Sequence, residues 1–172
     1  ERILYNGMRS ALTMGPEGKT FYYSDYSANA KKSYHPDPWP CCSGTYPQVV
    51  ADYLVSAYFH DEDGIYVNLF VPSEVKWKGL TVTQTTDDPA PPIATTLRIK
   101  GSGRCAIRVR VPSWAKRIDA GKFVTIEKEW KDGDTVEFEF PNGPREMAID
   151  DANPRLTATM LGPVLMVKTR DD

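Results

Sequence analysis

A chain of 172 residues that is 41% hydrophobic and 26% charged has room for one ordinary folded domain, or for one domain and a piece of another. Its formal net charge is −2 and it has no long run of Lys or Arg, which argues against nucleic acid and anionic membranes as partners. No apolar stretch approaches the roughly 18 residues of a membrane span, and 14 prolines with 12 glycines favour many turns and short strands.

The first part of the chain has a helical pattern. From Ile3 to Leu12 the apolar residues recur on one face of a helix, and Gly15-Pro16 ends that pattern. Phe21-Tyr22-Tyr23 predicts a short strand, and the polar, proline-rich stretch from Ser24 to Pro40 predicts a loop. Because the chain opens at Glu1 in helical rhythm and without an initiator Met, we expect it to be part of a larger protein.

A second helix is marked more clearly. Thr45 and Gln48 stand three residues apart as a capping box, and Pro47 suits the first turn. The helical stripe that follows consists of Val49, Val50, Tyr53, Leu54, Ala57 and Tyr58. The helix is predicted to end near His60, before a turn at Asp61-Glu62-Asp63-Gly64 that we interpret as a solvated turn. We therefore divide the chain into residues 1–62, with helices and a loop, and residues 63–172.

The second part predicts short strands. They are expected at Ile65–Val71, Leu80–Thr85, Thr95–Lys100, Cys105–Val111, Val124–Trp130 and Thr135–Phe140, with one or two more in Leu156–Val167 around Gly162-Pro163. Hairpin turns are predicted at Gly101-Ser102-Gly103 and at Lys131-Asp132-Gly133-Asp134. The fold class is therefore mainly β with N-terminal helices, and residues 63–172 are predicted to form an antiparallel β-sandwich.

Period-two alternation assigns the faces of these strands. The residues predicted to be buried are Ile65, Val67, Leu69, Val71, Cys105, Ile107, Val109, Val111, Val136, Phe138 and Phe140. Arg108 and Arg110 are expected on the outer face. Cys105, at an inward position, is predicted to pack in the core, and Trp114 and Trp130 are expected to cap the sandwich.

One stretch, Pro38-Trp39-Pro40-Cys41-Cys42-Ser43-Gly44-Thr45, is not explained by local structure. A zinc ion bound by the adjacent thiols of Cys41 and Cys42 would deprotonate them and make a strong nucleophile. The alternative, equally consistent with the sequence, is that Cys41 and Cys42 are two small buried hydrophobic residues without a chemical role. Two cysteines leave a tetrahedral zinc site incomplete, and His35 is a weaker candidate for a further ligand.

Several motifs in this order resemble the bacterial β-L-arabinofuranosidase glycoside hydrolases, a family once known only as a domain of unknown function. The motifs are Leu4-Tyr5-Asn6, Phe21-Tyr22-Tyr23, Trp39-Pro40-Cys41-Cys42, Asp63-Gly64-Ile65-Tyr66-Val67-Asn68-Leu69, Arg110-Val111-Pro112-Ser113-Trp114-Ala115, Trp130-Lys131-Asp132-Gly133-Asp134 and Gly162-Pro163-Val164. The resemblance implies that residues 1–62 are the end of an (α/α)₆ catalytic barrel, which β-sandwich domains follow.

The resemblance also implies a retaining mechanism and assigns roles within it. Cys41 becomes the nucleophile and a zinc ligand, and Cys42 becomes a zinc ligand. The acid/base glutamate and the remaining zinc ligands are expected upstream of this chain, so the chain alone is expected to be inactive. Ser43-Gly44-Thr45 stands where the arabinofuranosidases have Pro-Pro-Asn, so the resemblance does not fix the sugar.

Two classes of function stay open at this point. The first is part of a glycoside hydrolase with a carbohydrate substrate, and the missing N-terminal part of the barrel is its expected partner. The alternative is a non-catalytic structural or carbohydrate-contacting β-sandwich with a vestigial pair at Cys41 and Cys42. The compartment is left open between bacterial cytoplasm and periplasm, since reduced thiols favour the cytoplasm only slightly.

Overall fold

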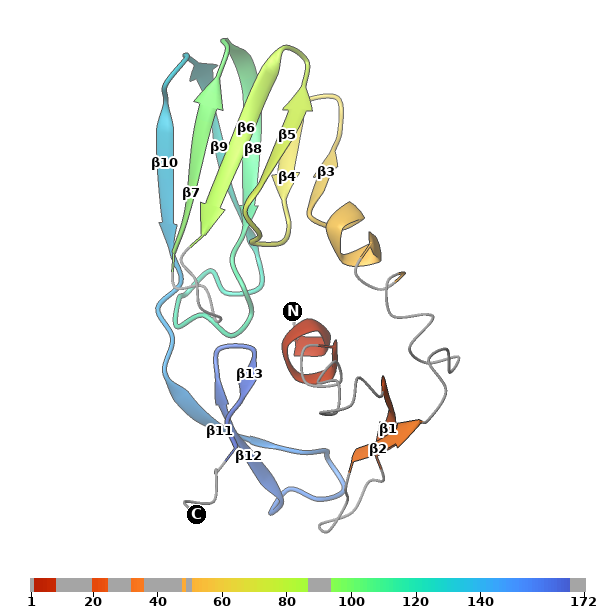
Figure 1. Ribbon diagram of the computed structural model, residues 1–172. Coiled ribbons are helices and arrows are strands. Elements are labelled where there is room, and N and C mark those ends of the chain that lie inside the picture. Colours follow the sequence, from red (N-terminus) through yellow and green to blue (C-terminus); the bar gives the residue numbers. More distant parts are fainter. Residues whose placement is uncertain are drawn as a thin grey trace. The chain divides into compact units, whose positions relative to one another are not determined.

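The computed structural model describes residues 2–8, 20–24, 32–35, 48, 51–86 and 94–167, and the chain forms two compact units, Glu1–Val55 and Ser56–Asp172. The first unit contains a π-helical segment, Ile3–Met8, and helical residues 51–55. Its strands β1 (Thr20–Ser24) and β2 (Lys32–His35) pair antiparallel (Figure 1). The strand predicted at residues 21–23 is therefore confirmed. The loop predicted from residue 24 to 40 is wrong at β2, because backbone pairing with β1 overrides its polar composition.

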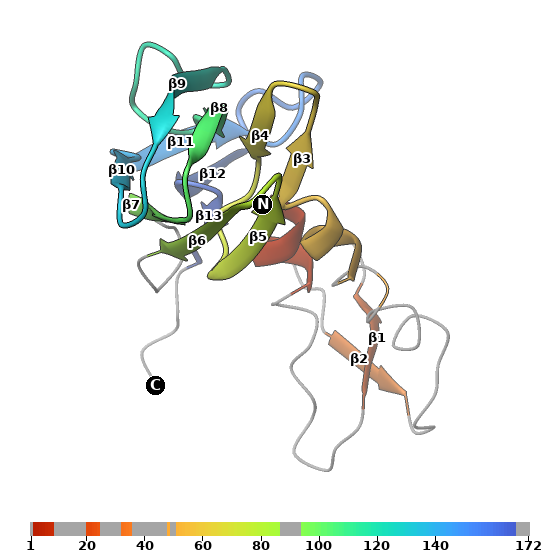
Figure 2. The ribbon, with the colours of Figure 1, turned by 90° about the horizontal axis from the view of Figure 1, so that it is seen from above.

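The second unit contains a sandwich of two four-stranded sheets, seen as two layers in Figure 2. The first sheet has the order β3-β4-β8-β9, with β3 at Tyr58–His60, β4 at Gly64–Val67, β8 at Gly103–Arg110 and β9 at Phe123–Trp130. The second sheet has the order β10-β7-β6-β5, with β10 at Thr135–Glu139, β7 at Ala94–Lys100, β6 at Leu80–Thr86 and β5 at Ser73–Trp77.

A three-stranded sheet follows the sandwich in the sequence. It consists of β11 (Pro144–Ala148), β12 (Thr157–Leu161) and β13 (Val164–Leu165), paired antiparallel in that order. One or two strands are predicted around Gly162-Pro163, and the structure has two there, β12 and β13. In the described residues, no helix is long and apolar enough to cross a membrane.

The core lies between the two layers and follows the predicted alternation. Along β8 and just beyond it, the inward side chains Cys105, Ile107, Val109 and Val111 are buried, and the small side chain of Ala106 between them is buried as well. Phe138 and Phe140 are buried as predicted, whereas Val136 is half-buried against the core. Burial of these apolar side chains is the main stabilising term of the sandwich, because each removes apolar surface from water.

Both predicted hairpin turns are instead crossings between the two sheets. The segment at Gly101-Ser102-Gly103 leads from β7 in one sheet to β8 in the other, and Lys131–Asp134 leads back from β9 to β10. The two crossings bind each other, since the Gly101 amide donates to Asp132 Oδ1 at 2.8 Å and the Ile99 amide donates to the Asp134 carbonyl at 2.8 Å. The turns lie where the sequence predicts them, but the strands that they join pair with other partners.

Two further predictions around the start of the sandwich are wrong. The helix predicted to reach His60 ends at residue 55, and Tyr58–His60 form β3, because they pair with β4. The strand predicted to run to Val71 ends at Val67, so Phe70 is buried although its alternation placed it outside, and Val71 is only half-buried. In addition, β4 pairs parallel with β8, which departs from a wholly antiparallel sandwich.

The glycine at position 64 allows the parallel strands β4 and β8 to lie close together. A Cβ at Gly64 would lie 1.9 Å from the carbonyl oxygen of Ala106 on β8. Gly64 is buried and pairs directly with Ala106. The absence of a side chain at this position is therefore a condition for the β4–β8 register.

Candidate functional site

The two cysteines with predicted chemistry, Cys41 and Cys42, lie outside the described residues, so their roles stay predictions. His35 ends β2 and His60 ends β3. Among the residues that the structure describes, no group of three or more His, Cys, Asp or Glu is placed to hold a metal ion.

The third cysteine, Cys105, packs in the core as predicted. It is 4% exposed, and burial raises the pKa of its thiol, which disfavours the reactive thiolate. The indole Nε1 of the fully buried Trp130 donates to the Cys105 carbonyl at 3.0 Å. Trp114 is 7% exposed and contacts Phe140 edge to face, with ring centroids 6.3 Å apart. Both tryptophans thus complete the core, as predicted.

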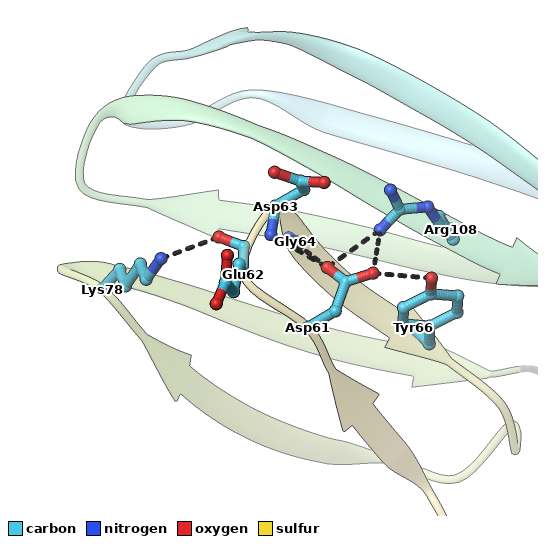
Figure 3. A network of polar contacts seen from close by, with 7 residues as sticks. All are labelled: Asp61, Glu62, Asp63, Gly64, Tyr66, Lys78 and Arg108. Carbon is cyan, nitrogen blue, oxygen red and sulfur yellow. Dashed lines mark hydrogen bonds and ion pairs between the residues drawn. The ribbon is translucent and has the colours of Figure 1, made fainter.

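The described part of the chain has a polar network around Asp61, in the turn between β3 and β4 (Figure 3). Asp61 Oδ1 accepts the backbone amides of Asp63 and Gly64, each at 2.9 Å, which closes the turn on itself. Asp61 Oδ2 accepts the hydroxyl of Tyr66 on β4 at 2.7 Å. Arg108 on β8 donates Nη1 to both carboxylate oxygens at 3.3 Å, so Asp61 joins the turn to two strands.

The hydrogen bonds determine the charge state of this network. The hydroxyl of Tyr66 is the largest cause that holds the pKa of Asp61 below its usual value, and the two amides and Arg108 act in the same direction. The same bond raises the pKa of Tyr66. Asp61 therefore stays ionised and has its oxygens occupied, which suits a structural role and not the work of a general acid.

The outer face of the first sheet carries aromatic side chains beside this network. The guanidinium carbon of Arg108 lies 4.7 Å from the centroid of the Tyr66 ring, a cation–π contact. Phe123 on β9 meets Tyr66 edge to face with centroids 5.4 Å apart, and it is 42% exposed. Arg108 is thus fixed from two sides, and its side chain is 19% exposed.

A second turn binds the first one at the same end of the sandwich. The β5–β6 turn contains Lys78 and Gly79 with φ angles of 43° and 83°, the left-handed pair of a two-residue hairpin turn. Lys78 is the one non-glycine residue with positive φ in the described part of the chain. Its Nζ donates to the Glu62 carbonyl at 2.7 Å (Figure 3). The same Nζ lies 4.6 Å from the centroid of the Trp77 ring.

A cavity of about 420 Å³ lies where these turns meet β8 and β9. The residues that supply polar groups or a ring to its wall are Glu62, Asp63, Trp77, Lys78, Arg104, Arg108 and Glu127. Arg104 Nη2 and Glu127 Oε1 are 3.2 Å apart across neighbouring strands, with side chains 73% and 59% exposed. All residues that line this cavity belong to the second unit.

Sequence reasoning missed this site. The sequence predicts a solvated turn at Asp61, Glu62 and Asp63, whose side chains are exposed, and an outward position for Arg108, but not the network that joins them. The local signal was available, because an Asp followed two and three residues later by Asp and Gly favours a side chain that accepts their amides. The contacts of Arg108 and Lys78 with this turn cross 47 and 16 residues of sequence, and no local pattern predicts them.

Comparison with known proteins gives a family match for the sandwich and a similar fold for most of the chain. Residues 64–142 match the family model described as β-L-arabinofuranosidase, GH127 middle domain. Comparison with curated proteins gave no match. Among solved structures, a GH127 β-L-arabinofuranosidase from Geobacillus stearothermophilus T6 is similar with a TM-score of 0.73 and 20% identity, over 94% of this chain and 31% of that one.

A solved structure described as a glycoside hydrolase is similar in the same way, with a TM-score of 0.71 and 20% identity over 94% of this chain and 32% of its own. The chain therefore spans about a third of the length of these relatives. The sandwich strands β4 to β10 lie within the matched segment. The sandwich of this chain therefore matches the model of the GH127 β-L-arabinofuranosidase middle domain, and the fold of the chain is similar to that of these solved structures.

Proposed function

We propose that this chain forms part of a retaining glycoside hydrolase that acts on β-L-arabinofuranosides or related plant-polysaccharide sugars. The observation that supports the proposal most is the match of residues 64–142 to the GH127 middle domain. The motif Trp39-Pro40-Cys41-Cys42, which precedes that segment, adds two candidate reactive groups. Together they favour a cysteine-dependent glycosidase over a purely structural sandwich.

In the proposed mechanism, Cys41 is the nucleophile. Its thiolate attacks the anomeric carbon, a C–S bond forms, and the glycosidic C–O bond breaks. The departing oxygen takes a proton from a glutamate that is contributed by another part of the enzyme. Water, deprotonated by the same glutamate, then attacks the anomeric carbon and releases Cys41, so that two inversions give net retention.

The donor set at the cysteine pair fits zinc. Cys41 and Cys42 supply two soft thiolates, the ligand type that zinc binds in tetrahedral sites. Zinc, when bound, lowers the pKa of a coordinated thiol so that it is a thiolate at neutral pH. Cys42 is proposed to hold the metal without attacking the sugar. The remaining ligands are proposed to come from a longer polypeptide, and the 172-residue chain alone is proposed to release no sugar.

Serine variants in a GH127-length protein that carries this chain test this division of roles. Cys41→Ser should abolish release of arabinose from a β-L-arabinofuranoside, and added zinc should restore almost none of it, because an alcohol on zinc is a poor nucleophile. Cys42→Ser should lower zinc content first, so that excess zinc restores part of the rate. Equal rescue of both variants would contradict the assignment of Cys41. Sugar release by the 172-residue chain alone would contradict the need for a longer polypeptide.

A further inference from the structure

The cavity between the β3–β4 turn, the β5–β6 turn and strands β8 and β9 is not used by the proposed chemistry. Figure 1 shows that these two turns, and both crossings between the sheets, gather at one end of the sandwich. We propose that this cavity is an accessory binding site for a neutral sugar residue of a polysaccharide chain. The choice of a sugar rests on the proposed hydrolase function, whereas the site itself rests on the following contacts.

The size and the wall of the cavity suit a small polyhydroxyl ligand. At about 420 Å³ it falls within the volume range of roughly 300–1,000 Å³ that is typical of small-molecule sites. Trp77 supplies a half-buried aromatic wall, against which the apolar C–H face of a sugar can pack. Carboxylates accept from sugar hydroxyls and cationic groups donate to them, and the wall contains both.

The charges in the wall balance each other, which favours a neutral ligand. The acidic side chains are Glu62, Asp63 and Glu127, and the basic ones are Lys78, Arg104 and Arg108. An anion would meet three carboxylates and a cation would meet three basic groups. A ligand with hydroxyl groups can use both kinds without a net electrostatic cost.

The backbone that carries the acidic residues is held in place before any ligand arrives. The Asp61 carboxylate accepts the Asp63 amide, and the Ala106 amide on β8 donates to the Asp63 carbonyl at 3.0 Å. Lys78 holds the Glu62 carbonyl. These bonds use the backbone of Glu62 and Asp63, and both side chains are exposed at the cavity. A pre-ordered wall lowers the entropy cost of binding.

Lys78 is itself an unusual residue for its position. Its φ angle of 43° is strained for a residue with a Cβ, and the first position of such a hairpin turn favours Asn or Gly. The lysine side chain spans from the turn to Glu62 and lies over the ring of Trp77. A strained residue retained at a cavity wall is consistent with a binding role.

The Arg104–Glu127 pair is the part of the wall that a ligand can open. Both side chains are mostly exposed, so the ion pair contributes little stability and its donors and acceptors are available for exchange. Arg108, by contrast, is fixed by Asp61 and Tyr66. The site therefore has a rigid side and an adaptable side.

Affinity electrophoresis of the full 172-residue chain in gels that contain arabinan tests the proposal. The wild-type chain should be retarded, and Asp63→Asn and Lys78→Asn should each weaken the affinity at least ten-fold. Asn is well suited to the Lys78 position of the turn, so the second variant keeps the fold while it removes the ammonium group. Glu129→Gln is the matched control, because Glu129 is exposed on β9 and lies outside the cavity wall.

Trp77→Ala should abolish retardation as well, and its melting temperature must be measured in parallel because Trp77 also packs against the core. The proposal would be overturned if the wild-type chain is not retarded, or if only anionic polygalacturonan retards it. It would also be overturned if Lys78→Asn, Asp63→Asn and the wild type have equal affinity. The assay involves no hydrolysis and is repeated with Cys41→Ala. Retardation that persists in Cys41→Ala would support the binding site whether or not the protein is a hydrolase. Loss of retardation would refute the binding site and leave the proposed hydrolase activity untouched.

Discussion

Replacement of Gly64 by alanine tests how closely strands β4 and β8 approach each other. The new Cβ would lie 1.9 Å from the Ala106 carbonyl oxygen and 2.7 Å from its carbonyl carbon. Real Cβ contacts are not shorter than 3.0 Å, so the strands would have to separate by about 1.1 Å, the difference between 3.0 and 1.9 Å. The obstacle is backbone on a paired strand, which cannot rotate away as a side chain does.

The expected destabilisation is at least about 3 kcal/mol, the upper end of the range for overpacked sites, because the shift also strains buried hydrogen bonds of the ladder. At about 4 °C or more per kcal/mol for a small domain, the melting temperature should fall by roughly 12 °C or more. Thermal unfolding followed by circular dichroism measures this shift.

Gly143→Ala is the matched control for this variant. A Cβ at Gly143 would approach only the flexible end of Lys116, with Nζ at 2.6 Å, so the lysine moves aside. That variant should stay within about 0.5 kcal/mol of wild type. If the Gly64 variant melts within a few degrees of the wild type, strands β4 and β8 do not approach each other as closely at Gly64 and Ala106 as described.

Three further predictions concern the described residues. The Tyr66 hydroxyl lowers the pKa of Asp61, so the ionised carboxylate stabilises the fold above its unfolded pKa near 3.9 and loses that effect as the pH falls through the lower folded value. Between about pH 5 and pH 2, the free energy of unfolding in urea should therefore fall less steeply for Asp61→Asn than for the wild type. An equally steep fall in both proteins would contradict this. Trp130→Phe should cost about 2–4 kcal/mol in denaturant unfolding, because it leaves a buried carbonyl without its donor and a smaller ring in the core, and a loss below about 1 kcal/mol would refute it. With Cys41-Cys42 changed to serine, Cys105 should react with a thiol reagent only in denaturant, since it is 4% exposed; rapid labelling of the native chain would disagree.

The sequence predicted the sandwich well where alternation is strict. From Cys105 to Val111 the inward and outward faces are as predicted, because every second side chain faces the other layer. Turn residues at Gly101 and Gly133 also marked the ends of strands, and both glycines have positive φ. These local signals do not show which strand each strand pairs with. The two crossings between the sheets are therefore predicted as hairpins.

Long-range pairing explains the other differences. Tyr58 and its neighbours fit a helical stripe, yet β3 forms because its pairing with β4 lets Tyr58 reach Ser73 at 2.8 Å and Gln84 at 3.0 Å. The parallel register of β4 with β8 needs Gly64, whose role is visible only when Ala106 is beside it. The cavity at the end of the sandwich likewise joins residues that are far apart in the chain, and no period in the sequence relates them.

The central claim is that Cys41 is the nucleophile of a retaining glycosidase, and a trapped intermediate tests it most directly. A GH127-length protein that carries this chain is mixed with a β-L-arabinofuranoside that has a fast leaving group, quenched in acid, digested and analysed by tandem mass spectrometry. We predict a peptide with one pentosyl group localised to Cys41, and its absence in Cys41→Ala, which should also lack turnover. Turnover that persists in Cys41→Ala, or a pentosyl group localised to a carboxylate, would contradict the account.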